Sequence, residues 1–593
     1  MADDRSDDGN RSGASDIDLP QRQVVIPDAV DHFLGKLKDS LETRNIPDIN
    51  KLYEEDFNKL SEKHYKAPRN KHEDGRWPAA DAVRDQISDH PLFLILYKEL
   101  YYRHVYSRLQ PTFEDRRGSW ENYCKLIELL ISDLEEGDEL TVALPPQWIW
   151  DILDEFVYHY QTYCNFRNKT INLEAKNQKS DILLLRANPN VFETPAVLSY
   201  LQQLINASKI EEFLKNPDSE NKKGLAYKDP SARLFGYYGL MQMLRMHSLL
   251  GDYHSAMQTI DHIDFHQEVP LFYKIPACHV SLHYYMGFAY LMMRRYKDAI
   301  RTFADVIVWL SKTSGVNQSS YQYDQMRKKE EQMYSLLLIC TALCPQPLDE
   351  SINKQIGDRF PEKHARLQRG EANCFEELFS YACPKFVSAA VPSDLGEGTF
   401  KFNEAHERQL HLFLQDVKQQ HLLPRISSYM KLYTSLQTSK LAQLCEMDEE
   451  GLRDQLMCVM NKTRQQVRQK GRPLDGEREL CSEVEFYLDG DMVHINAQKT
   501  ELAHSDISTK EKRHRHNRSG VRAKFGASMR IRAPPRRRLR RRPWRAPRAR
   551  GSVAEPRRSG GPARVCARAA FSSPDVFMEQ ISKFQDLIQK MEK

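Results

Sequence analysis

The sequence predicts a mainly α-helical fold, in which a stack of helical hairpins is followed by a small module containing strands and by a last helix. Three observations predict it. Apolar residues recur at helical spacing from about residue 26 to residue 435. Two central stretches place small residues where paired helices would meet. The period becomes two after Gly471 and Pro473, which indicates strands.

The first part of the chain divides into an acidic segment and a helical region. Residues 1–25 are acidic and poor in apolar groups, which predicts disorder. Residues 26–230 are predicted to be helical, with one helix beginning at Pro91, because proline is favoured at the first helical position. Another helix is expected to begin at Pro145-Pro146. Four of its residues stand four apart on one face that must be buried: Trp148, Ile152, Phe156 and Tyr160.

Residues 231–435 are predicted to form repeated helical hairpins similar to tetratricopeptide repeats. Small residues in such repeats let the two helices of a hairpin approach closely. Four residues of the clearest repeat match the tetratricopeptide spacing: Gly287, Tyr290, Ala299 and Phe303. Ala256 and Ile260 fill the last two of these places in an earlier stretch. A stack of this kind presents surfaces and has no built-in active site.

Residues 436–498 are predicted to form a winged-helix module. Thr438 and Ser439 are expected to cap a short helix, and Asp448 to open a second helix. Val484, Phe486 and Leu488 then alternate with polar residues, and Asp489-Gly490 is a strong signal for a two-residue hairpin turn. Two helices followed by a β-hairpin are the parts of a winged helix.

The end of the chain combines a basic segment with a predicted helix. Residues 499–573 are low in complexity, and within them residues 512–568 hold 21 Lys and Arg and a single acid, Glu555. The Arg, Ala, Gly and Pro content is typical of GC-rich codons, so the segment is interpreted as a translated intron or gene-model artefact. The alternative is a disordered basic arm that binds RNA nonspecifically. Residues 574–593 predict a C-terminal bundle helix.

Composition excludes several classes of protein. The acidic amino terminus is unlike a signal peptide, no apolar run reaches the roughly 18 residues of a membrane helix, and the 11 cysteines show no disulfide-like spacing. These features predict a cytoplasmic protein. The sequence contains no phosphate-binding loop, dinucleotide fingerprint, zinc-protease motif, nucleophile elbow or C-x-x-C pair. We therefore expect no enzyme activity, no cofactor and no metal site.

Two sets of residues are candidates for binding. Apolar residues of the hairpin and the C-terminal helix are predicted to bind protein partners: Val484, Phe486, Leu488, Val493, Ile495, Phe577, Ile581, Phe584, Ile588 and Met591. Basic residues at the end of the second winged-helix helix and after it are candidates for RNA contact: Lys462, Arg464, Arg468, Lys470 and Arg472. Protein docking is favoured, because acids crowd the start of that helix.

Several long motifs resemble one known family. The most telling segments are Phe93–His104, Gln147–Phe156 and Leu249–Tyr253. Three further segments also match: Met286–Tyr296, Glu376–Phe386 and Ser482–Tyr487. Together they resemble the subunit L family of eukaryotic translation initiation factor three, from about residue 25 to 500 and again from about residue 575. The insertion at 499–573 departs from that family.

The resemblance implies a PCI domain, which is a helical repeat stack ending in a winged helix, followed by C-terminal helices that join a shared bundle. It also implies a non-catalytic scaffold subunit that assembles on the small ribosomal subunit and supports mRNA recruitment and scanning. The implied direct partners are the sister subunits E and K, with contact to mRNA or rRNA less strongly indicated. Two alternatives remain: a direct RNA-binding protein that uses the winged helix and basic arm, or a PCI subunit of a proteasome-lid-like complex.

Overall fold

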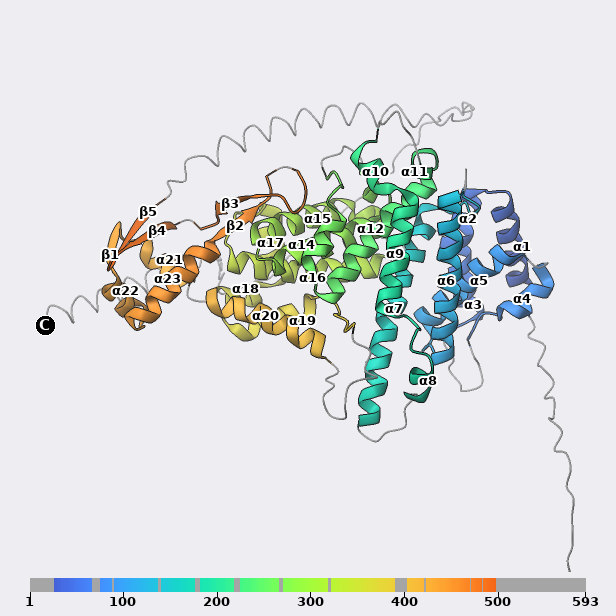
Figure 1. Cartoon of the computed structure of the whole chain (residues 1–593), viewed down its shortest axis with the longest axis horizontal. Helices are drawn as coiled ribbons and strands as arrows, with labels where there is room; N and C mark the ends of the chain where they lie inside the picture. The colour runs from blue at the N-terminus through green and yellow to red at the C-terminus, as the bar shows by residue number, and fades with distance from the viewer. Residues whose placement is uncertain are drawn as a thin grey trace, which may run out of the picture. The chain divides into compact units, whose positions relative to one another are not determined.

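The fold is mainly α-helical, as the sequence predicted (Figure 1). The computed structural model describes residues 26–66, 75–87, 90–136, 140–175, 182–217, 224–265, 270–317, 322–389, 403–420, 423–469, 471–482 and 484–497. The predicted disordered segment 1–25, the basic insert and the C-terminal helix lie outside these residues. The predicted domain limits therefore stay predictions.

The N-terminal half is built only from helical elements within the described residues. They are α1 (Asp28–Glu42), α2 (Ile46–Lys51), a π-helical turn (Leu52–Asp56), α3 (Phe57–His64), α4 (Ala80–Ile87), α5 (Pro91–Arg108), α6 (Phe113–Glu136), α7 (Pro146–Ala175), α8 (Ile182–Ala187), α9 (Thr194–Ser208), α10 (Ile210–Lys215) and α11 (Leu225–Lys228).

Both helix starts predicted from proline are confirmed. Pro91 is the first residue of α5, where the ring nitrogen Nδ1 of His90 accepts a hydrogen bond from the backbone N–H of Phe93. Pro146 is the first residue of α7. The predicted face of α7 is buried, with all four residues fully shielded from solvent: Trp148, Ile152, Phe156 and Tyr160. Each such large apolar side chain stabilises the fold by roughly 1.5–3 kcal/mol.

A second run of helices follows and supplies most of the remaining core. It comprises α12 (Pro230–Leu250), α13 (Tyr253–Thr259), a 3-10 turn (Leu271–Lys274), α14 (Pro276–Met292), α15 (Tyr296–Asn317), α16 (Tyr323–Leu343), α17 (Glu350–Arg359), α18 (Pro361–Gln368), α19 (Ala372–Ala382), α20 (Glu404–Gln420) and α21 (Leu423–Met430).

Neighbouring helices of this run pack as antiparallel pairs. Helix α12 packs on α13 and α14, α14 packs on α15, and α15 packs on α16. The turn after α12 is made by Gly251, whose φ of 83° suits glycine, and Asp252 then caps α13 by accepting from the N–H of Ser255. The chain therefore reverses direction in two residues, as expected for a helical hairpin.

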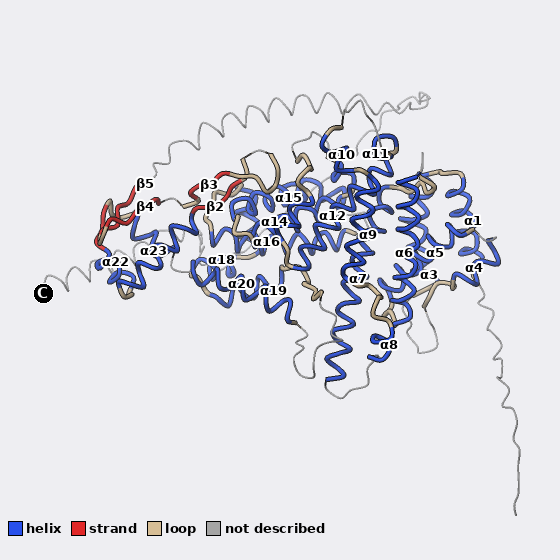
Figure 2. Tube along the Cα trace, viewed as in Figure 1, coloured by secondary structure: helices blue, strands red, loops and turns tan. Residues whose placement is uncertain are grey.

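The strands gather in two small sheets (Figure 2). They are β1 (Ser435–Gln437), β2 (Arg464–Val467), β3 (Glu477–Leu480), β4 (Val484–Asp489) and β5 (Met492–Ala497), with α22 (Thr438–Cys445) and α23 (Glu449–Thr463) between β1 and β2. One antiparallel sheet has the order β1-β5-β4, and the other pairs β2 with β3. The predicted turn at Asp489-Gly490 is present, because Asp489 pairs directly with Met492.

The two sheets belong to different hydrophobic cores. The three-stranded sheet, α21, α22 and α23 enclose a small core that contains Leu441, Leu452 and Val493. Val467 of β2 and Cys481, which directly follows β3, belong instead to the large core of the helical run. The strands β2 and β3 thus belong structurally to the helical stack, although they lie between the helices and the hairpin of the small module in sequence.

The predicted cap of the first helix of the small module differs from the structure. Helix α22 begins at Thr438 itself, after Gln437, and has no side-chain cap. The Thr438 hydroxyl donates instead to the carboxylate of Glu449, at 2.6 Å, so it ties α22 to α23. The second helix opens after Asp448 as predicted, and the Asp448 carboxylate caps it by accepting from the N–H of Gly451. Within the described residues, none of the helices combines the length and apolar character that crossing a bilayer demands.

Candidate interaction site

The predicted partner-binding residues of the hairpin face inward. Val484, Phe486, Val493 and Ile495 are at most 7% exposed and lie in the small core, and Leu488 is half-buried against it. Their alternation marks the face of the sheet that α22 and α23 cover. These side chains hold the module together and are not available to a partner. The predicted C-terminal seam of Phe577, Ile581, Phe584, Ile588 and Met591 lies outside the described residues.

Strand β4 lies at one edge of the three-stranded sheet. It pairs with β5 along one edge, and among the described residues no strand pairs with its other edge. Tyr487 on its outer face is 49% exposed and stacks on His494, with 5.0 Å between the ring centroids. An unpaired edge presents a row of backbone N–H and C=O groups that another chain can join.

The candidate RNA-contacting residues do not form one surface. Lys462 is largely buried, with its ammonium paired to Asp416 at 2.5 Å. Arg468 lies over the ring of Phe265, and Arg472 pairs with Asp261 at 3.1 Å. Arg464 is about half exposed and pairs with Glu485 at 3.3 Å. Lys470 lies outside the described residues.

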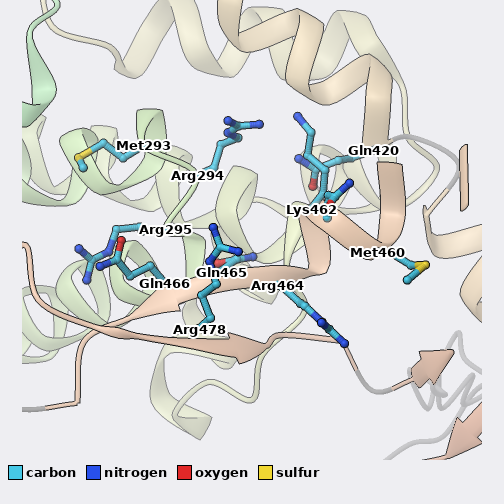
Figure 3. Close-up of a pocket in the computed structure, with 11 residues that line it drawn as sticks. Met293, Arg294, Arg295, Gln420, Met460, Lys462, Arg464, Gln465, Gln466 and Arg478 are labelled. Carbon is cyan, nitrogen blue, oxygen red and sulfur yellow. The ribbon is translucent and has the colours of Figure 1, made fainter. Parts of the chain in front are cut away.

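Lys462 and Arg464 instead line a cleft that the sequence did not reveal (Figure 3). The cleft has a volume of about 470 Å³ and lies between the turn that joins α14 to α15, the end of α23, and the strands β2 and β3. Its lining residues are Met293, Arg294, Arg295, Gln420, Met460, Asn461, Lys462, Arg464, Gln465, Gln466 and Arg478. We call it the basic cleft, because five of these residues are cationic and none is a carboxylate.

Several hydrogen bonds hold the inner wall of the basic cleft together. Arg295 is 3% exposed and donates to Asp298 at 2.9 Å, to the carbonyl of Leu474 at 3.1 Å and to the carbonyl of Asp475 at 2.9 Å. The Tyr290 hydroxyl donates to the carbonyl of Pro473 at 2.8 Å. These bonds attach the loop between β2 and β3 to the turn after α14.

The outer cations of the basic cleft are more exposed. Arg294 sits in the turn after α14 with a positive φ of 60° and a side chain 54% exposed, and its nearest carboxylate is Asp416 at 3.8 Å. Arg478 is exposed on β3 and faces Gln466 across the β2–β3 pair. Figure 3 shows the cations arriving from separate elements and spread along the cleft instead of meeting at one point.

A second cavity, of about 460 Å³, has a mixed lining of aromatic and charged residues. Inside it, the Lys329 ammonium lies 3.5 Å from the ring centroid of Tyr284 and 5.1 Å from that of Tyr285. Burial, reinforced by the nearby charge of Arg245, lowers the pKa of Lys329 to about 7. Within the described residues, no group of histidine, cysteine and acidic side chains is arranged to hold a metal ion.

Comparison with known proteins identifies the family. Residues 115–513 match a family model described as "RNA polymerase I-associated factor PAF67". A Nematostella vectensis protein named "Eukaryotic translation initiation factor 3 subunit L" is 39% identical over 490 residues, which is 81% of this chain and 90% of that protein. Proteins of the same name are 38% identical in Homo sapiens, over 77% of this chain and 80% of the relative, and 36% identical in Mycosarcoma maydis, over 82% and 72%. Because these matches extend over most of both chains, the chain belongs to the eukaryotic translation initiation factor 3 subunit L family.

Proposed function

We propose that the chain is a non-catalytic scaffold subunit of eukaryotic translation initiation factor 3 that works in the cytoplasm. The single observation that carries this proposal is the identity of 36–39% to relatives that bear this subunit name, across most of the chain. In this role the chain would assemble with sister subunits, notably E and K, and support mRNA recruitment and scanning on the small ribosomal subunit.

The architecture supports a role in assembly. Strand β1, helices α22 and α23, and the β4–β5 hairpin have the order of elements found in a winged helix, and a run of paired helices precedes them. We interpret this combination as a PCI domain. Its β4 edge is the surface that we assign to a neighbouring subunit, because strand addition uses backbone hydrogen bonds that a free edge already presents.

The residues that line the basic cleft favour a role in binding an anion and not a role as an active site. Guanidinium, ammonium, amide and thioether groups line it. None of these groups serves readily as a general base or a nucleophile near neutral pH, since guanidinium stays protonated and Lys462 is paired with Asp416. An anion held there would be bound without being transformed.

A winged helix that reads nucleic acid through α23 is less well supported. The first turn of α23 carries Glu449 and Glu450 directly after Asp448. Arg453, the nearest cation on this helix, pairs with Glu449 and Asp491. Negative charge at the end that would enter a groove repels phosphate. The names of the relatives likewise favour an initiation factor over a proteasome-lid-like complex.

Co-purification of the intact tagged chain from its source cells tests the proposal. We expect mass spectrometry to recover subunits of initiation factor 3, with E and K among the most abundant. Tyr487→Asp introduces a charge on the outer face of β4, beside its unpaired edge, and the double variant Ile581→Asp and Phe584→Asp introduces charge in the predicted C-terminal seam. Each should reduce that recovery about tenfold. Both place charge on surfaces that we assign to partners.

The matched control replaces exposed apolar residues by Asp at positions away from both assigned surfaces. Leu183 and Leu412 are exposed apolar residues, 76% and 50% accessible, on α8 and α20. Changing both to Asp should leave recovery unchanged. Full recovery with either test variant would remove that surface from the proposal. Failure of the unaltered chain to recover any initiation factor subunit would overturn the proposed function itself.

A further inference from the structure

The basic cleft carries more positive charge than its carboxylate partners neutralise. Asp416 pairs with both Arg294 and Lys462, Asp298 pairs with Arg295, and Glu485 pairs with Arg464. Asp298 is also 3.9 Å from Arg301. Among the residues that the structure describes, three carboxylates therefore pair with cations of the cleft, which has five, and this leaves an excess of two positive charges.

Strand geometry keeps the acids of β3 away from the basic cleft. Successive side chains of a strand point to opposite faces, so Arg478 faces one way, whereas Glu477 and Glu479 face the other. Glu479 pairs with Lys297 at 2.7 Å on that other side. In register, Gln466 stands opposite Arg478, and Gln465 stands opposite Glu479. The face of β2–β3 that carries Arg464, Gln466 and Arg478 is thus free of acids.

The remaining lining adds hydrogen-bond donors and little apolar surface. Four side-chain amides lie among the cations, and only Met293 and Met460 are apolar. Protein partners usually bury apolar or aromatic anchors at the centre of an interface. Interfaces with nucleic acid are more polar and more positive, and most of their hydrogen bonds go to phosphate and sugar.

We propose that the basic cleft binds the phosphodiester backbone of RNA, with Arg294, Arg464 and Arg478 as the contacting cations and Arg295 and Lys462 as fixed parts of the wall. The spread of the three contacting residues over a helical turn and two strands suits successive phosphates along a strand. The absence of aromatic residues among the eleven that line the cleft means that bases are not stacked there, so the contact is independent of sequence. The assignment of this RNA to the small ribosomal subunit rests on the proposed function. The assignment of the cleft as an RNA-binding site does not depend on it.

Ultraviolet crosslinking of the intact chain to a 12-nucleotide oligouridylate tests the proposal. Mass spectrometry then maps the crosslinked peptides. We expect adducts on the peptides that contain Met293–Arg295 and Met460–Gln466. In recombinant protein produced from the printed sequence, residues 512–568 provide an internal reference, because their 21 Lys and Arg attract RNA equally in every variant. The measured quantity is the ratio of cleft adducts to adducts in that segment.

Three variants make the result specific. The double variant Arg294→Gln and Arg478→Gln removes two exposed cations and should lower the ratio at least fivefold. Arg294→Lys with Arg478→Lys keeps the charge and should retain most of the ratio. Arg117→Gln with Arg369→Gln removes two cations that are 42% and 66% exposed elsewhere, and should leave the ratio unchanged.

Three outcomes would overturn the proposal. The first is adducts confined to residues 512–568, and the second is a ratio that the Gln variant does not lower. The third is displacement of the RNA from the cleft by an equal concentration of a 12-residue polyglutamate, which would assign the cleft to an acidic protein segment. Recovery of sister subunits by the Gln variant is measured in parallel. If the subunits are still recovered, a failure of RNA binding overturns the cleft proposal alone and leaves the proposed function intact.

Discussion

Gly287 of α14 lies directly against the ring of Phe303 of α15. A Cβ atom on Gly287 would come within 2.4 Å of Cε1 and 2.6 Å of Cζ of Phe303, which is closer than such atoms approach. Phe303 is fully buried, so its ring has little room to move. The small residue that the repeat pattern singled out is therefore what lets these two helices touch.

Gly287→Ala should destabilise the chain by about 1–3 kcal/mol, because it overpacks a filled core. Gly35→Ala is the matched control, since Gly35 is also helical but has nothing within 4 Å of its added Cβ. That change should be neutral or stabilise by up to about 1 kcal/mol through helix propensity. Urea unfolding followed by circular dichroism measures both. Equal effects of the two substitutions would contradict the close contact.

Glu99 should be essential for the stability of the N-terminal half. Its fully buried carboxylate accepts from the Trp148 indole N–H at 2.9 Å and pairs with Arg103 at 2.6 Å. Glu99→Ala leaves buried donors without this acceptor and should cost about 3–5 kcal/mol. Thermal unfolding checks the loss. Glu55→Ala, which breaks an exposed pair with Lys59, should change the melting temperature too little to resolve.

Two buried histidines should make the chain sensitive to acid. Burial lowers the pKa of His279 to about 2 and that of His283 to about 4, with the charge of His283 adding to the shift of His279. Between these values and about 6.5, the unfolded chain binds protons that the folded chain does not. The free energy of unfolding should therefore fall as the pH decreases from about 6.5 to 4.

His279→Phe removes one of these titrations and suits a site lined by Phe272 and Trp309, whose rings lie 5.1 and 4.3 Å from that of His279. Its unfolding free energy should depend less steeply on pH than that of the unaltered chain. Denaturant unfolding at several pH values measures the slope. His254→Gln, at an exposed position, should keep the original slope. If the unfolding free energy of His279→Phe depended on pH as steeply as that of the unaltered chain, titration of His279 would not explain the acid sensitivity.

Arg295→Met should loosen the β2–β3 sheet without loosening the hairpin. The substitution removes the bonds from Arg295 to Asp298, Leu474 and Asp475 that hold the β2–β3 loop. Hydrogen exchange should accelerate across residues 464–480 and stay slow in β4 and β5, which belong to the other core. Arg294→Met, at the exposed neighbouring position, should leave both regions protected. Uniform acceleration across both sheets would show that the cores are not separate.

Local signals in the sequence predicted the elements that they control. Proline at the first helical position marked α5 and α7, and alternation with an Asp-Gly turn marked the hairpin. No strand was predicted at β2, and the change to period two after Gly471 and Pro473 was assigned to the hairpin and not to β3, because Glu477-Arg-Glu-Leu480 is charged and becomes a strand through pairing with β2. That pairing and the packing of Val467 on distant helices are tertiary contacts, which the local spacing of apolar residues does not predict.

The candidate sites were harder to predict for the same reason. Alternation in Val484–Leu488 showed that one face is apolar but not that α22 and α23 cover it. The basic cleft joins Arg294, Lys462 and Arg478, which are far apart in the sequence. Only the folded chain brings them together. Thr438 likewise depends on a residue of another helix, because its hydroxyl donates to Glu449 instead of capping its own helix.

The backbone passes between the two cores three times: between Val417 and Ile426, between Val459 and Val467, and between Cys481 and Val484. The last two passes are bonded to each other, since the N–H of Cys481 donates to the carbonyl of Thr463 at 2.8 Å. A protease that cut the chain at Ser482 would leave a nicked molecule whose pieces remain associated through β1, β4 and β5. It would migrate as one particle in gel filtration and as two bands under denaturing conditions.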